Sequence, residues 1–131
     1  MAEVPRLALI VRPGCNDDHL AAALESVGYV VIQADSFFVA RTRLTEDVQL
    51  LITDLRLGEY NGLHLVLVAK HQHPKVLAIV AAETADDVLQ REARSMDATY
   101  IVRPEREQDL ARAVVELVRS RPGPHLPIAG R

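Results

Sequence analysis

The stretch Leu50-Leu51-Ile52-Thr53-Asp54-Leu55-Arg56-Leu57 decides the fold, because an apolar run ends there in a single carboxylate. We predict a buried strand over 48–53, followed by Asp54 and by a loop that closes on Gly62. In an open parallel α/β sheet, ligands bind beside the carboxyl ends of the strands. Asp54 therefore stands where a working acid is expected.

Short apolar runs alternate with amphipathic stretches along the rest of the chain. Four further runs are predicted strands, at 7–11, 29–32, 76–80 and 99–102. Helical spacing, caps and stop signals predict helices over 17–27, 36–44, 63–72, 84–94 and 105–119. Five strand–helix units predict the α/β class. Specifically, we expect a flavodoxin-like three-layer α/β/α sandwich whose five-stranded parallel sheet has the order 2-1-3-4-5.

Length and composition exclude several classes of protein. The 131 residues fit one domain, which we assign to 1–120, and the Pro- and Gly-containing segment 121–131 is predicted to be a flexible tail or linker stub. With a net charge of -3, the chain has no excess of positive charge with which to bind nucleic acid or an anionic membrane surface. One cysteine suits a reducing compartment, and no apolar run is long enough for a membrane helix. We expect a cytoplasmic protein that binds neither nucleic acid nor membrane.

Three local motifs are similar to those of a known family. Gly62 follows Asp54 by eight residues within Asp-Leu-Arg-Leu-Gly-Glu-Tyr-Asn-Gly-Leu, Tyr100-Ile-Val-Arg-Pro ends the last predicted strand, and Leu24-Glu-Ser-Val-Gly-Tyr ends the first predicted helix. At these residues the chain resembles the response-regulator receiver domains of two-component signalling, over about 6–119. The resemblance implies a signalling module and not an enzyme. It places Asp54 at the position that accepts phosphate.

The resemblance also implies a set of functional side chains around the aspartate, most of which this chain lacks. The family has an acid pair after the first strand, and Arg12 and Pro13 (or Val11 and Arg12, in the other register) stand there. Ala81 stands at the position of a hydroxyl and Arg103 at that of a lysine. Tyr100 matches an aromatic switch residue, and Pro104 matches a proline that follows a cis peptide bond. The loop positions Arg56 and Gly62 complete the set.

Several expectations follow for the side chains around Asp54. Arg103 first, and Arg12 second, should contact Asp54 and lower its pKa. The acids Asp17 and Asp18 are interpreted as helix N-terminal residues that the helix dipole favours. Thr84 is interpreted as a helix cap rather than as a substitute hydroxyl. Tyr100 is expected to turn inward where Ala81 leaves space, and an ordinary, partly exposed strand tyrosine is the alternative.

Three functions remain open at this stage. The first is an atypical receiver, or pseudo-receiver, that acts through protein partners such as a histidine kinase, an output domain or a second copy bound through the fourth helix, fifth strand and fifth helix. It would have no catalytic residues, no metal ligands, no cofactor and weak or absent Mg²⁺ binding. The second is a phosphorelay receiver still phosphorylated on Asp54. The third, a flavodoxin-like cofactor binder, is disfavoured because loop 13–17 lacks the composition that cradles a phosphate.

Overall fold

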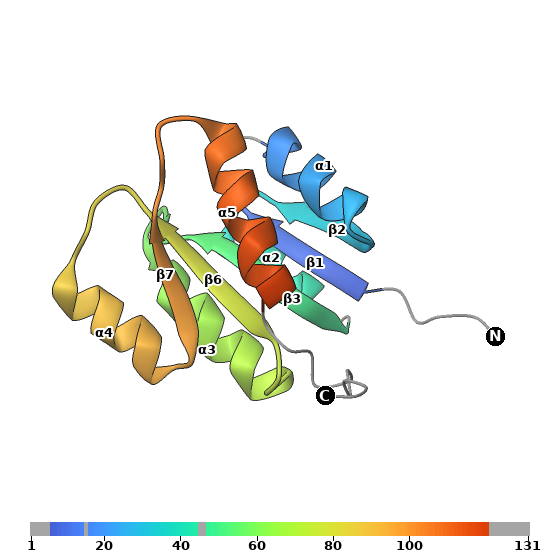
Figure 1. Cartoon of the computed structure of the whole chain (residues 1–131). Coiled ribbons are helices and arrows are strands. Elements are labelled where there is room, and N and C mark those ends of the chain that lie inside the picture. The colour runs from blue at the N-terminus through green and yellow to red at the C-terminus, as the bar shows by residue number, and fades with distance from the viewer. Residues whose placement is uncertain (1–5, 15, 45–46, 121–131) are drawn as a thin grey trace, which may run out of the picture.

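The computed structural model describes residues 6–14, 16–44 and 47–120, in one α/β body (Figure 1). The elements in chain order are β1 (Arg6–Val11), α1 (Asp18–Ser26), β2 (Tyr29–Ala34), α2 (Phe37–Arg43), β3 (Val48–Asp54), β4 (Arg56–Leu57), β5 (Tyr60–Asn61), α3 (Gly62–Gln72), β6 (Leu77–Ala82), α4 (Asp87–Ser95), β7 (Ala98–Val102) and α5 (Glu107–Ser120). Within the described ranges, no helix has both the length and the apolar character needed to cross a bilayer.

The main sheet has five parallel strands in the order β2-β1-β3-β6-β7. With the two short strands of the β4–β5 pair left aside, this is the predicted order 2-1-3-4-5, and the predicted fold class is confirmed. Among the described residues α5 is the last element, and the assignment of one domain to 1–120 stays a prediction. The tail assigned to 121–131 lies outside the described residues.

Alternation along the strands builds two cores, one on each face of the sheet. Ala8, Ile10, Leu50 and Ile52 face α1 and α5, where Leu24, Leu110 and Val114 cover them. Their neighbours Leu9, Val11 and Leu51 face α2, α3 and α4. Figure 1 shows α1 and α5 together on one face of the sheet and α3 and α4 on the other. Two-sided cover is what the unbroken apolar strands predicted.

A small antiparallel hairpin between β3 and α3 was not predicted from the sequence. β4 pairs with β5, with Arg56 opposite Asn61 and Leu57 opposite Tyr60. The two-residue turn begins with Gly58, whose φ of 65° suits the first central position of the tight turns that hairpins favour. The strands have only two residues each, so no periodic signal could reveal them.

The sequence placed the start of α4 too early. Thr84 is not the cap, because the Asp86 side chain accepts hydrogen bonds from the backbone N–H groups of Val88 and Leu89. Aspartate and threonine are both good N-cap residues, and the aspartate satisfies two donors at once. The displaced Thr84 instead supplies a backbone carbonyl to the site described below.

Gly62 fixes the loop that carries the chain away from Asp54. Its backbone N–H donates to the carbonyl of Leu55. A Cβ at this position would lie 2.2 Å from the backbone oxygen of Asp54, a distance at which the backbone itself must move. The glycine is therefore required by close packing against the end of β3.

We predict that Gly62→Ala destabilises the protein by about 3 kcal/mol, the upper end of the usual cost of overpacking, because a clash with the backbone cannot be relieved by a side-chain rotation. Urea unfolding gives the free energy directly. Gly58→Ala is the matched control: its Cβ would meet nothing within 4 Å, so only the strain of its positive φ remains, roughly 1–2 kcal/mol. Equal losses for the two variants would contradict this view of the loop.

Candidate functional site

Asp54 is the last residue of β3 and lies beside Ala81 in the neighbouring strand. The backbone N–H of Leu55 donates to the carbonyl of Ala81 at 2.8 Å, which holds the two strand ends together. The Asp54 side chain is 21% exposed. A half-buried carboxylate at the carboxyl edge of the sheet is the centre of the candidate site.

Arg103 binds this carboxylate, as the sequence predicted. Its Nη2 donates a hydrogen bond to Asp54 Oδ1, and the Arg103 side chain is 13% exposed. The Arg103 backbone is held in place because its N–H donates to the carbonyl of Ala82 at 2.7 Å. Among the described residues, its Nη1 is the one buried side-chain atom that has no hydrogen-bond partner.

Asp17 is a second buried acid of the site. It caps α1 by accepting from the N–H of Leu20 at 3.1 Å, as expected, but it also lies 3.3 Å from Arg12 Nη1 and 3.9 Å from Arg103 Nη1. Gln33 helps to place it, because its Oε1 accepts from the Asp17 backbone N–H at 2.8 Å. The expectation that Asp17 is only a helix-terminal acid was therefore incomplete. Asp18 is exposed in the first turn, as expected of a helix-terminal acid.

Arg12 stands directly after β1, where the resemblance implied an acid. Besides Asp17, its Nη1 reaches Glu107 at 3.4 Å in the first turn of α5. Pro13, the other position of the missing pair, is exposed. The described site thus holds two arginines and two buried or half-buried acids. This arrangement links the ends of β1, β3 and β7 to the first turns of α1 and α5.

The pKa of Asp54 is raised above its ordinary value of 3.8, which corrects the lowering expected from the sequence. Burial of the carboxylate raises the pKa and is the largest cause. Arg103 opposes it through its charge and its hydrogen bond, Arg12 opposes it more weakly, and the negative charge of Asp17 raises the pKa further. The nearby cations could be inferred from the sequence, but the desolvation of the carboxylate depends on how deeply the fold buries it.

The peptide bond before Pro104 is trans, so the predicted cis bond was wrong: the described residues contain no cis peptide bond. That prediction rested on the resemblance alone. The trans isomer is favoured for X–Pro bonds by about 0.5–1 kcal/mol, and nothing in this loop's sequence opposes it. Arg103 reaches Asp54 from the trans geometry.

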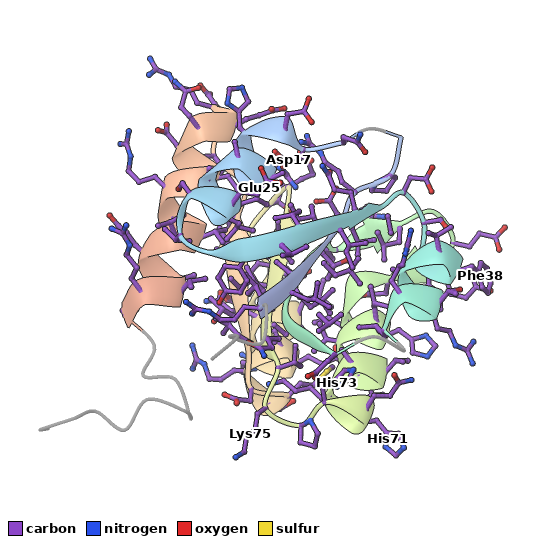
Figure 2. The ribbon with its side chains drawn as sticks, turned by 90° about the vertical axis from the view of Figure 1, so that its right-hand side faces the viewer. Asp17, Glu25, Phe38, His71, His73 and Lys75 are labelled. Carbon is purple, nitrogen blue, oxygen red and sulfur yellow. The ribbon has the colours of Figure 1, made fainter. Side chains whose placement is uncertain are left out.

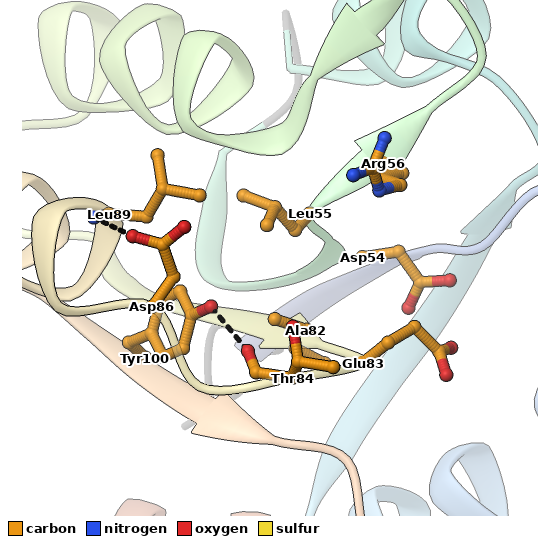
Figure 3. Close-up of a pocket in the computed structure, with 10 residues that line it drawn as sticks. Asp54, Leu55, Arg56, Ala82, Glu83, Thr84, Asp86, Leu89 and Tyr100 are labelled. Atoms are coloured by element: carbon orange, nitrogen blue, oxygen red, sulfur yellow. Dashed lines mark hydrogen bonds between the residues drawn. The ribbon is translucent and has the colours of Figure 1, made fainter.

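A pocket of about 200 Å³ opens beside Asp54 and Ala81. Tyr100 lines it, with its ring half-buried against the core and its hydroxyl donating to the carbonyl of Thr84 at 2.8 Å (Figure 3). Leu89 and the exposed Arg56 line it as well. Burial, followed by the charge of Asp86, raises the pKa of the Tyr100 hydroxyl, so it stays a hydrogen-bond donor at neutral pH. Whether this ring ever changes rotamer remains a prediction.

The donor set does not fit Mg²⁺. This ion prefers oxygen ligands in near-ideal octahedral geometry, usually with one or two carboxylates. Here Arg103 occupies an oxygen of Asp54, and Arg12 stands where a carboxylate would complete the set. No group of three potential ligands suited to a metal ion is found among the described residues. An arginine beside each acid supplies the positive charge that a metal would otherwise bring.

Several solved structures have the same architecture as this chain. A response regulator from Thermotoga maritima is similar over 89% of this chain and 100% of its own, with a TM-score of 0.72 and 25% identity. The chain has the fold of response-regulator receiver domains. A CheY-like receiver domain protein from Methanospirillum hungatei has a TM-score of 0.72 and 23% identity, over 88% and 95% of the two chains. No family model and no curated protein sequence matches the chain.

One similar structure shows what a receiver site can carry. A response regulator from Burkholderia pseudomallei, at 23% identity and a TM-score of 0.67, covers 88% of this chain and 75% of its own. That protein was solved with a phosphorylated aspartic acid, a calcium ion and citrate. The resemblance drawn from the motifs around Asp54, Tyr100 and Gly28 is thus confirmed at the level of the fold.

Sequence reasoning brought together Asp54, Ala81, Tyr100 and Arg103, and the structure places them at one sheet edge. It missed Gln33 and Glu107, which hold Asp17 and Arg12. Gln33 gave a weak signal, because it is a polar residue at the end of an apolar strand run. Glu107 gave none, since acids are common in the first turn of any helix.

We predict that the pKa of Asp54, measured by NMR titration of its side-chain carboxyl carbon, lies above 3.8. Arg103→Gln should raise it further, and Arg12→Gln should raise it by less. Because the folded-state pKa exceeds the unfolded-state value, the contribution of Asp54 to stability is fully present below the unfolded pKa. It is lost as the pH rises through the folded pKa.

The pH profile of stability tests the same point independently. Over this range, wild type should lose stability relative to Asp54→Asn as the pH rises, because asparagine cannot ionise. A measured Asp54 pKa below 3.8, or a wild type that gains stability relative to the variant, would contradict the dominance of burial.

Proposed function

We propose that the protein is a receiver domain that acts as an interaction module without Mg²⁺-dependent phosphorylation of Asp54. The contact between Arg103 and Asp54 is the single observation that carries this proposal. An accepting aspartate attacks the incoming phosphorus with one of its two carboxylate oxygens, and it must be ionised to do so. Here the guanidinium already binds Oδ1, which leaves Oδ2 alone for the attack, and burial raises the pKa of the carboxyl and so disfavours the ionised form.

The electrostatics of phosphoryl transfer support the proposal. The transition state spreads negative charge over the equatorial oxygens, and catalysis consists largely of placing cations and donors around them. Arg103 offers charge, but its planar guanidinium is already committed to Asp54, whereas a lysine ammonium is compact and can shift between partners. Ala81 has no hydroxyl to donate.

A switch of the receiver kind also needs two states that the ligand distinguishes. The side chain at position 81 is a methyl group, so phosphate on Asp54 would find no hydroxyl there to draw in. Tyr100 already donates to Thr84 and packs against the core. We therefore propose one dominant Tyr100 rotamer, whatever the state of Asp54.

The face proposed for partners consists of α4, β7 and α5. β7 is an edge strand, and none of its five residues is fully buried. Ala93 is the one buried residue of α4, while Val88 and Val102 are 63% and 44% exposed. An edge strand and a lightly packed helix leave apolar surface and backbone groups for a kinase, an output domain or a second copy.

A role in phosphorelay is the second candidate function, and the environment of Arg103 Nη1 favours it. That buried donor has no hydrogen-bond partner, and Asp17 lies 3.9 Å away as an ion-pair neighbour only. A phosphoryl oxygen on Asp54 is one group that could satisfy it. Under this reading, Arg103 would release Asp54 and hold the phosphate.

Intact-protein mass spectrometry separates the two candidates. After incubation with acetyl phosphate and Mg²⁺, we expect no phosphoryl adduct on wild type. Asp54→Asn is the blank, and Arg103→Lys tests whether the guanidinium alone blocks the reaction. An adduct on wild type that is absent from Asp54→Asn would establish the phosphorelay role instead.

Rebuilding the missing groups should restore a response. We predict that a variant with Arg12→Asp, Pro13→Asp, Ala81→Thr and Arg103→Lys shows amide shift changes at Tyr100 and along 85–94 when beryllofluoride and Mg²⁺ are added. Wild type should show none of comparable size under the same conditions. Large changes in wild type would contradict the proposal of a fixed Tyr100.

A further inference from the structure

A second surface lies away from both Asp54 and the α4–β7–α5 face. A groove of about 610 Å³ runs between α2 and α3, and its lining residues are Arg41, His64, Leu67, Val68, Lys70, His71 and Gln72. This groove, together with Phe38 and Tyr60, is called the α2–α3 face below. Phe38 lies one helical turn before Arg41 in α2, and Tyr60 lies two residues before the start of α3. Figure 2 shows Phe38 and His71 at the surface on this side of the molecule.

Three aromatic rings, those of Phe37, Phe38 and Tyr60, pack together at this face. The buried Phe37 stacks on Tyr60, with ring centroids 4.6 Å apart, and Phe38 meets Tyr60 edge-on at 5.0 Å. Phe38 is nevertheless 56% exposed. Rings at these separations attract one another. Phe38 is thus an aromatic side chain that is exposed and already ordered, so that a partner would lose little entropy in binding it.

The α3 side adds an exposed apolar residue at the centre of a helical stripe. His64, Leu67 and His71 are three and four residues apart, so they lie along one face of α3. Leu67 is 56% exposed, and four of the seven exposed large hydrophobics in the described part of the chain are Phe38, Val39, Tyr60 and Leu67. Clustering of exposed apolar side chains around a groove is typical of a binding surface.

The charge of the groove specifies the partner. Its described lining contains Arg41, Lys70 and two histidines but no acid, although the protein as a whole carries a net charge of -3. Lys70 is partly engaged, because it donates to the carbonyl of Val76 and pairs with Asp97. Arg41 is exposed at the rim. Because Asp97 balances the charge of Lys70, Arg41 is the exposed cation of the described lining on an acidic protein.

We infer that the α2–α3 face binds an acidic amphipathic helix of a partner protein. A helix laid in a groove presents apolar anchors three and four residues apart, and Phe38 and Leu67 are exposed apolar side chains that such anchors would contact here. An acidic residue beside those anchors would meet Arg41. This inference rests on the proposed function, since it names a partner class for an interaction module, but it uses a different surface.

Two other occupants fit the same observations less well. A membrane surface needs a broad basic patch, whereas the described lining of this groove has two permanent cations, one of which, Lys70, is paired with Asp97. A second copy in a two-fold contact would present the same groove to itself, and because the described lining contains no acid, Arg41 would find no carboxylate there. An acidic helix has neither difficulty.

A display library of amphipathic helices tests the inference, with polar positions randomised among Glu, Lys, Ser and Gln. Selection on the full-length wild-type protein should enrich Glu beside the apolar positions. A selected helix, made as a peptide, should shift the amide signals of residues 38, 41, 64, 67 and 71 in NMR. Arg41→Glu and Leu67→Asp should each weaken its binding about tenfold or more.

Matched controls lie on α4. Val88→Asp and Arg91→Glu repeat the same chemical changes at exposed positions and should leave the affinity for the selected helix unchanged. Enrichment of Lys, no enrichment, or full binding by Leu67→Asp would overturn the inference. So would the same shifts produced by anionic phosphatidylserine vesicles or by raising the protein concentration alone. An acetyl phosphate adduct on wild type would overturn only the proposed function.

Discussion

The ion pair between Arg103 and Asp54 is the contact on which the rest of this site depends. It joins the ends of β3 and β7 through side chains that are 21% and 13% exposed. Partly buried ion pairs are stable only when each partner stays satisfied, since an unpaired buried charge is far more costly than the pair itself. If Arg103 moved away, the charge of Asp54 would lose its ion-pair partner, and the same holds for Arg12 and Asp17. Each of the two buried or half-buried acids of the site is therefore already paired with an arginine, whereas a metal-dependent site must keep its carboxylates accessible to ions and substrate.

The backbone explains why these four side chains meet. Arg12, Asp54 and Arg103 each lie at the carboxyl end of a parallel strand, so the sheet alone brings them to one edge. Asp17 reaches the same place from the N-terminus of α1, where it also caps the helix. Gly62 lets the following loop pass against the end of β3 without displacing Asp54. The fold is that of a receiver domain, and its side chains set the chemistry that this edge can support.

Much of this could be predicted from the sequence, because the deciding signals were local. Apolar runs bounded by turn residues located all five strands of the main sheet, and the strand ends located Asp54, Arg103 and Ala81. What failed depended on three-dimensional context. The pKa of Asp54 turns on water excluded by the fold, the partners Gln33 and Glu107 come from distant segments, and the β4–β5 hairpin is too short for periodicity. The cis bond before Pro104 was carried over from a resemblance, and the chain around it imposes no such geometry.

The central claim that we propose is that arginine, rather than a metal ion, neutralises the acids at the carboxyl edge of this sheet. The most direct test is a Mg²⁺ titration of isotope-labelled wild type at constant ionic strength, followed by NMR at the Asp54 and Arg56 amides. The account predicts small, linear shifts that do not saturate at low millimolar Mg²⁺. Saturable shifts in that range, centred on Asp54, would show that the carboxylate remains available to a metal and would contradict the account.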